Sequence, residues 1–130
     1  NIQGNRPVEV PIPGSAVLAR KTSVVERLRK VLPHDAVIDD PMETRAYECD
    51  ALTAYRCPPM VAVLPATTEE VSAVLRVCHE MGVPVVPRGS GTSLAGGALP
   101  TADCVILGVA RMNAVLETDY DNRFVRVQTG

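Results

Sequence analysis

Residues 87–97 carry the residue types that bind a negatively charged group. Pro87 and Arg88 end a β-branched run, and a loop of glycines and small hydroxyl residues follows as far as Gly97. Glycine tolerates a positive φ, so such a loop turns tightly and its backbone N–H groups converge. Converging N–H dipoles suit an anion such as a phosphate. A surface turn without a ligand is the alternative, but ordering so long a loop costs conformational entropy that a ligand would offset.

Two familiar phosphate-binding loops do not fit this stretch. A Walker loop needs a lysine before serine or threonine, and the sequence has no lysine after Lys30. A Rossmann loop needs a third glycine where Leu94 stands, followed by a helix, and residues 95–100 are a poor helix. We therefore predict that a loop between strands holds the anion, and not a helix N-terminus.

The elements before the loop form a strand–helix–strand unit. Residues 60–64 are typical of a buried strand, and Thr67 with Glu70 has the form of a capping box that opens a helix. Gly82 ends this helix, and residues 83–86 are the next strand. Two strands joined by one helix run parallel with a right-handed crossover. The loop is thus expected at the carboxyl end of a parallel strand, where α/β sheets bind ligands.

The N-terminal part of the chain is less regular. Residues 1–13 are interpreted as an extended or poorly ordered leader, because they hold three prolines and little periodicity. Apolar spacing predicts a helix over residues 15–32, with Ser23 as its N-cap and Glu26 reaching back to it. A short strand is expected at residues 36–38.

The remaining segments connect and extend this unit. Residues 42–57 are predicted to form a short helix and a crossing loop, with Asp50 and Arg56 as loop anchors. Three further strands are expected, at residues 104–108, 116–119 and 123–128. The last two of these form a hairpin, and the alternation within the last predicts a half-buried strand.

Composition narrows the possible functions. The 130 residues suffice for one small domain or part of a larger one, and a net charge of −2 with 3% aromatic residues argues against nucleic acid as a partner. No run is long enough for a transmembrane helix, and no secretory signal is evident. The four cysteines form no Cys-x-x-Cys pair and are interpreted as small buried residues in a reducing compartment, so a cytoplasmic location is expected. His34 and His79 have no ligand-spaced neighbours, so no metal is expected.

Residues 87–97 resemble the pyrophosphate loop of FAD-linked oxidases of the vanillyl-alcohol oxidase/p-cresol methylhydroxylase (PCMH) superfamily. The branch most similar is the one that contains the glycolate oxidase D subunit and D-lactate dehydrogenase. Residues 47–50, 63–71 and 125–130 also fit this family, so the resemblance covers residues 46–130.

The resemblance implies an α+β (α/β) fold, the first subdomain of a PCMH-type FAD-binding domain. This would be a βαβ unit plus further strands in a small mixed sheet, with an N-terminal helix. Residues 1–55 would be a leader and helical segment, and residues 56–130 the first part of the FAD-binding domain. The second part and the substrate domain would lie outside this chain.

The resemblance also assigns the loop to the FAD diphosphate. Gly89 and Gly91 would allow close approach, and the hydroxyls of Ser90, Thr92 and Ser93 would add donors. For Arg88 two roles stay open, contact with the phosphate or bracing of the loop. Pro65 would lie near the adenosine half. The predicted cofactor-binding residues are Pro65, Pro87, Arg88, Gly89, Ser90, Gly91, Thr92, Ser93, Gly96 and Gly97, and no catalytic residue is assigned.

The implied activity is oxidation of a 2-hydroxy acid such as glycolate or D-lactate, with hydride passing to flavin N5. Partners would be this small-molecule substrate and other oxidase subunits. Two alternatives stay open. One is another FAD-linked oxidase, similar to D-2-hydroxyglutarate dehydrogenase or alkylglycerone-phosphate synthase, and the other is a non-catalytic nucleotide- or phosphate-binding module. Because FAD in this fold lies between two subdomains, this chain alone is expected to hold little flavin.

The flavin is predicted to be noncovalent. Some members of the superfamily tether flavin through a histidine just after the loop glycines. The matching position here is Thr92, and residues 83–130 contain no histidine. Precipitation of the flavin-loaded protein with trichloroacetic acid should leave the flavin in the supernatant, and flavin retained on the precipitate would contradict the prediction.

Overall fold

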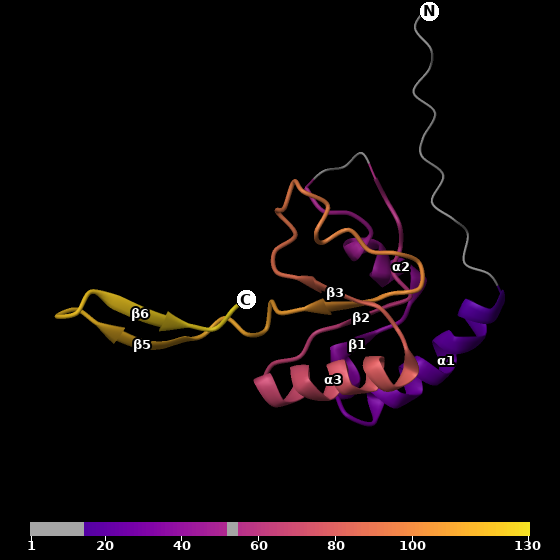
Figure 1. The fold of residues 1–130 in the computed structure, drawn as a ribbon, viewed down its shortest axis with the longest axis horizontal. Coiled ribbons are helices and arrows are strands. Elements are labelled where there is room, and N and C mark those ends of the chain that lie inside the picture. Colours follow the sequence, from indigo (N-terminus) through magenta and orange to yellow (C-terminus); the bar gives the residue numbers. More distant parts are fainter. Residues whose placement is uncertain (1–14, 52–54) are drawn as a thin grey trace, which may run out of the picture.

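The computed structural model describes residues 15–51 and 55–130 (Figure 1). The predicted leader over residues 1–13 lies outside the described residues. No helix in the described part of the chain is long and apolar enough to span a membrane.

The first helix, α1, spans Ser15–Arg29. The prediction of Ser23 as its N-cap is wrong, because Ser23 lies in the middle of the helix. Alanine, arginine and lysine, all strong helix formers, precede Ser23 and carry the helix through it. The C-terminal end also falls short of residue 32, since residues 30–32 form a turn before Pro33.

Four short strands form one mixed sheet: β1 (Val37–Ile38), β2 (Val61–Val63), β3 (Val85–Arg88) and β4 (Val105–Gly108). Their order is β1-β2-β4-β3, with β1 antiparallel to β2 and the other pairs parallel. The predicted parallel βαβ unit is therefore present, but β4 lies between its two strands. Burial explains the order. Every residue of β4 is buried, as a central parallel strand requires, whereas β3 is partly exposed and contains Pro87, which an edge strand tolerates.

The second long helix, α3 (Thr68–Met81), lies beside α1 on one face of the sheet (Figure 1). The core on this side combines apolar residues of both helices with alternate residues of the strands. Leu28 of α1 and Val74 of α3 are fully buried there with Val61 of β2. Arg27 of α1 forms an ion pair with Glu80 of α3, which adds a polar link between the helices.

A smaller core lies on the opposite face of the sheet. The intervening residues of the central strands, Ala62 and Ile106, are fully buried and pack with Tyr47. The chain reaches this face after β1 through two short helices, α2 (Pro41–Thr44) and η2 (Arg45–Tyr47). A third short helix, η1 (His34–Ala36), precedes β1 and places Ala36 in the first core. The predicted short helix before the crossing loop is thus confirmed. Asp40 caps α2, its carboxylate accepting from the N–H groups of Met42 at 2.7 Å and Glu43 at 3.3 Å.

The predicted C-terminal hairpin is confirmed as β5 (Val115–Asp119) and β6 (Phe124–Val127). It forms its own two-stranded sheet and projects away from the four-stranded sheet (Figure 1). The prediction of a half-buried last strand is wrong, because all four residues of β6 are exposed. Alternation buries one face only where a second layer covers it, and the described residues put no layer over this hairpin.

The α/β class predicted from the sequence is confirmed. The division of the chain at residues 55 and 56 stays a prediction. Strand β1, from before that division, pairs with β2 as the edge of the same sheet.

Packing between α1 and the sheet predicts a large difference between two leucine substitutions. Leu28 is fully buried, whereas Leu75 of α3 is 47% exposed. Leu28→Ala should lower the free energy of unfolding by about 2–5 kcal/mol, because it removes contacts and leaves a cavity. The matched control, Leu75→Ala, should cost less than about 1 kcal/mol. Urea unfolding followed by circular dichroism measures both, and equal losses would contradict the placement of α1.

Candidate functional site

The glycine-rich loop begins at the carboxyl end of β3, as predicted. It then crosses the sheet on the side opposite α1 and α3 and returns to the start of β4 (Figure 1). The connection between these two parallel strands therefore contains no regular helix. Backbone N–H groups of this loop are left available for a ligand because no helix uses them.

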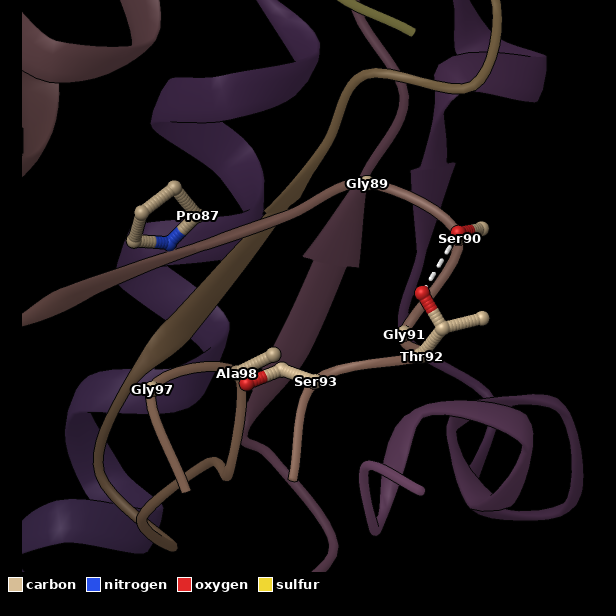
Figure 2. A pocket seen from close by; sticks show the side chains of 8 residues that line it. All are labelled: Pro87, Gly89, Ser90, Gly91, Thr92, Ser93, Gly97 and Ala98. Atoms are coloured by element: carbon tan, nitrogen blue, oxygen red, sulfur yellow. Dashed lines mark hydrogen bonds between the residues drawn. The ribbon is translucent and has the colours of Figure 1, made fainter. Parts of the chain in front are cut away.

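The loop encloses an open cleft of about 320 Å³ (Figure 2). Its lining comes almost wholly from the residues predicted to bind the cofactor. The lining residues are Pro87, Gly89, Ser90, Gly91, Thr92, Ser93, Gly97 and Ala98. Ala98 is the residue that sequence reasoning missed, and as a buried alanine it carries no polar signal. Three of the predicted residues do not line the cleft, namely Arg88, Gly96 and Pro65.

The described lining of the cleft offers hydrogen-bond donors and no negatively charged side chain. Among the described residues, no protein acceptor pairs with the backbone N–H groups of residues 89–93. The hydroxyls of Ser90 and Thr92 lie 3.3 Å apart and are exposed at the cleft (Figure 2). None of the described residues that line the cleft carries a charged side chain. This arrangement fits the diphosphate of a dinucleotide, because backbone N–H groups without a described acceptor, together with exposed hydroxyls, stabilise an anion without a lysine.

Gly91 is required by the shape of the loop. Its φ is +76°, in the left-handed region that other residues rarely adopt. A Cβ atom there would overlap the guanidinium group of Arg88, whereas a Cβ at Gly89 would meet no atom within 4 Å. Arg88 therefore packs against the inner side of the turn at Gly91.

The contacts of the Arg88 side chain support one of the two roles left open for it, bracing of the loop. Its Nη1 donates to the backbone oxygen of Cys49 at 2.6 Å, and its guanidinium lies 5.8 Å from the centre of the Tyr47 ring. The side chain is not part of the cleft lining, and it contacts the segment before β2. These contacts brace the loop, and contact of Arg88 with the phosphate stays a prediction.

Residues 47–51, which we call the strap, make further contacts with the loop. The N–H of Ala51 donates to the backbone oxygen of Ser93 at 3.1 Å, and the N–H of Gly96 donates to Asp50 Oδ2 at 3.1 Å. Asp50 is 4% exposed. The prediction of Asp50 as a loop anchor is confirmed, although the sequence did not indicate that the anchored segment is the glycine-rich loop.

The structure also shows the contacts of the second predicted anchor, Arg56, and the turn that follows β2. Arg56 Nη1 lies 3.3 Å from Glu48 Oε1, which links the two sides of the crossing loop. Pro65 is fully buried after β2, at the start of the turn into α3. Thr67 Oγ1 accepts from the N–H of Glu70 at 3.2 Å, which confirms the predicted capping box.

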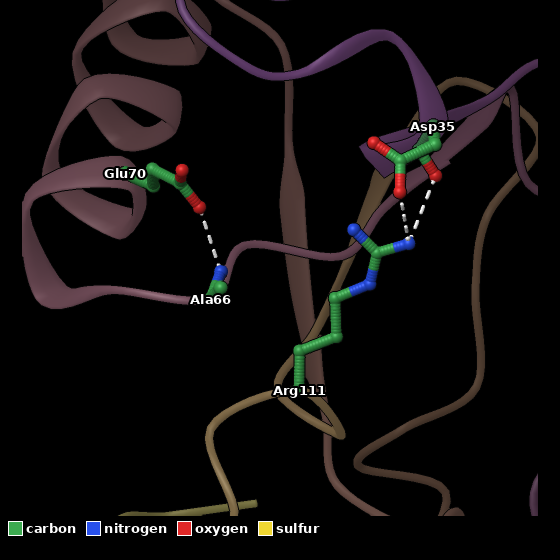
Figure 3. Close-up of polar contacts among 4 residues, drawn as sticks. All are labelled: Asp35, Ala66, Glu70 and Arg111. Atoms are coloured by element: carbon green, nitrogen blue, oxygen red, sulfur yellow. Dashed lines mark hydrogen bonds and ion pairs between the residues drawn. The ribbon is translucent and has the colours of Figure 1, made fainter.

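Figure 3 shows the reciprocal contact of this cap, in which Glu70 Oε2 accepts from the N–H of Ala66 at 2.7 Å. The same view shows Arg111, which follows β4. Its Nη2 donates to the backbone oxygen of Asp35 at 3.1 Å and to Oδ2 at 3.0 Å. Both contacts lie at one end of the sheet, the carboxyl end of the parallel strands, where the loop also begins.

The cysteines lie outside the cleft lining. Cys57, Cys78 and Cys104 are buried and Cys49 is partly buried, and all four are free thiols. Burial raises the pKa of Cys78 to about 11 and also raises the pKa of Cys57 and of Cys104. These three side chains are therefore neutral packing residues at physiological pH. Among the described residues, no group of three or more histidine, cysteine or acidic side chains is placed to hold a metal ion.

The loop, the cleft and the parallel strands define a nucleotide-binding α/β unit. Residues 59–130 match the FAD binding domain family. This stretch is more than half of the chain, and the chain belongs to that family. The predicted family and its cofactor, FAD, are confirmed.

Curated relatives are named as an oxidase subunit and as dehydrogenases. The chain is 46% identical over 110 residues to the glycolate oxidase subunit GlcD of Escherichia coli K12, covering 85% of this chain and 22% of that protein. It is 32% identical over 108 residues to D-lactate dehydrogenase of Anaerostipes hadrus (82% and 22%). It is 42% identical over 89 residues to mitochondrial D-2-hydroxyglutarate dehydrogenase of Bos taurus (68% and 16%). The chain thus spans 22% or less of the length of these relatives.

Solved structures share the fold. p-Cresol methylhydroxylase with substrate bound has a TM-score of 0.66 at 24% identity, over 87% of this chain and 22% of that one. Alkyldihydroxyacetonephosphate synthase has a TM-score of 0.64 at 22% identity, over 88% and 22%. The predicted PCMH-type fold is therefore confirmed.

The geometry of the loop predicts a graded response to three glycine substitutions. Gly89→Ala should change the free energy of unfolding by less than about 0.5 kcal/mol, since its φ is ordinary and the space is open. Gly82→Ala should cost about 1–2 kcal/mol, because φ is +59° and the space is open. Gly91→Ala should cost more than Gly82→Ala, because the Arg88 guanidinium must move and give up its hydrogen bond to Cys49 in addition to the φ penalty. Chemical unfolding without cofactor measures all three, and a Gly91→Ala loss no larger than that of Gly82→Ala would contradict the Arg88 placement.

Proposed function

We propose that this chain holds the diphosphate of FAD in a flavin-dependent oxidoreductase. The observation that carries the proposal is the cleft whose five backbone N–H groups, residues 89–93, have no acceptor among the described residues. These N–H groups and the hydroxyls of Ser90, Thr92 and Ser93 would bind the phosphate oxygens. The glycines at 89, 91 and 97 keep the backbone bare for close approach. Pro65 stands near the adenosine half in this proposal.

FAD, when bound, supplies the acceptor for a hydride. The residues of this chain bind and orient it. Their N–H and O–H dipoles offset the two phosphate charges, and the absence of a carboxylate from the lining avoids repulsion. Thr92 stands in the loop with no nucleophilic nitrogen, so we propose that the cofactor is held noncovalently.

For the whole protein we propose oxidation of a 2-hydroxy acid such as glycolate or D-lactate. The relatives named glycolate oxidase subunit and D-lactate dehydrogenase support this substrate class. The similarity to D-2-hydroxyglutarate dehydrogenase favours a second candidate of the same chemical class. Because the relative from Escherichia coli is named as a subunit of glycolate oxidase, we propose that this protein also assembles with other oxidase subunits. The four free thiols support a reducing compartment, the cytoplasm.

Anaerobic mixing of the FAD-loaded full-length protein with 2-hydroxy acids tests this function. Glycolate or D-lactate should bleach the visible absorbance of the flavin, and D-2-hydroxyglutarate should bleach it if the second candidate is correct. Bound flavin that none of the three acids reduces would overturn the substrate class and leave the cofactor proposal intact.

A matched pair of threonine variants tests whether FAD binds in the cleft. Thr92→Val removes a hydroxyl donor from the lining, whereas Thr118→Val removes one from the exposed strand β5. FAD should bind to Thr92→Val about tenfold more weakly, because a hydrogen bond to a charged group is lost. Binding to Thr118→Val should not change. Equal affinities in both variants would overturn the placement of the diphosphate.

A further inference from the structure

The strap, residues 47–51, precedes the part of the chain that matches the FAD binding domain family, yet it contacts the loop that lines the cleft. We propose that Asp50 and Arg88 are positioning residues that hold this loop open for the diphosphate before the cofactor arrives. The inference rests on the proposed function. It concerns two side chains that do not line the cleft themselves.

Three contacts between the strap and the loop are spread along the loop. At its start, Arg88 donates to the oxygen of Cys49 and fills the space inside the turn at Gly91. In its middle, the oxygen of Ser93 accepts from Ala51. Toward its end, the N–H of Gly96 donates to Asp50. The glycine-rich backbone between these points is therefore fixed at both ends and at its centre.

These contacts use loop groups that the cleft does not need. The strap binds the N–H of Gly96 and the carbonyl of Ser93, and it leaves the N–H groups of residues 89–93 without an acceptor among the described residues. A loop rich in glycine loses much conformational freedom when it becomes ordered. If the strap orders it in advance, less of the binding free energy of the cofactor is consumed in ordering the loop.

The role assigned to Asp50 depends on its oxygen and not on its charge. A buried carboxylate beside a diphosphate site opposes the anion electrostatically, so its charge weakens binding. Its hydrogen bond to Gly96 favours binding through the shape of the loop. The two effects separate in Asp50→Asn, which keeps an acceptor oxygen and removes the charge, and in Asp50→Leu, which has a similar size and no acceptor.

Affinities for FAD in the full-length protein test the proposal. Asp50→Leu should bind FAD at least about tenfold more weakly than wild type, because the part-buried N–H of Gly96 loses its acceptor and the loop loses its anchor. Asp50→Asn should bind FAD within about twofold of wild type or more tightly, since the acceptor is retained. Wild-type affinity in Asp50→Leu, or equal loss in both variants, would overturn the proposal. If wild type binds no FAD, the proposed function fails instead.

Hydrogen–deuterium exchange of the wild type, read at single residues, keeps the proposal testable should Asp50→Leu not fold. Without cofactor, the N–H groups of Ala51 and Gly96 should already exchange slowly, and those of residues 89–93 quickly. Addition of FAD should slow residues 89–93 and change Ala51 and Gly96 little. Fast exchange of Ala51 and Gly96 in the cofactor-free protein would overturn the proposal, since the loop would then be ordered only by the ligand.

Discussion

A site made of backbone N–H groups must keep those groups away from the chain's own carbonyls. Elsewhere in this fold, helices and strands pair N–H with C=O, as the stability of a folded backbone demands. Between β3 and β4 the chain instead runs through glycines and small hydroxyl residues, and the N–H groups of residues 89–93 have no described acceptor. The parallel strands, the bracing Arg88 and the buried Asp50 all serve to hold that stretch in place.

Local signals predicted most of the framework. Thr67 with Glu70 marked the start of α3, and Gly82 marked its end, because caps act between residues a few positions apart. The position of β4 between β2 and β3 was not predicted, since strand order depends on contacts between distant segments. The same limit explains β6, whose alternating sequence indicated a buried face that the described structure does not supply. The start of α1 was predicted wrongly at Ser23, because a residue of the capping type stays helical when it lies inside a run of helix formers.

The cleft was predictable because its glycines and hydroxyl residues are consecutive in sequence. Its support was only partly predictable. Asp50 was expected to anchor a loop, but its partner Gly96 lies 46 positions away, and no periodicity connects the two. The role of Arg88 was undecided from sequence because an arginine beside a phosphate loop has two plausible partners. In the structure its guanidinium donates to the carbonyl of Cys49.

The strap has a consequence for exchange of parts between related proteins. The matched family region begins at residue 59, so a chimera built on that boundary would transplant the loop of Gly91 and leave its strap behind. The host would then have to supply its own carbonyl for Arg88 and its own acceptor for Gly96. A chimera should therefore exchange two segments together, residues 47–51 and residues 87–98. In this fold the exchangeable unit is set by contacts in space and not by continuity of the chain.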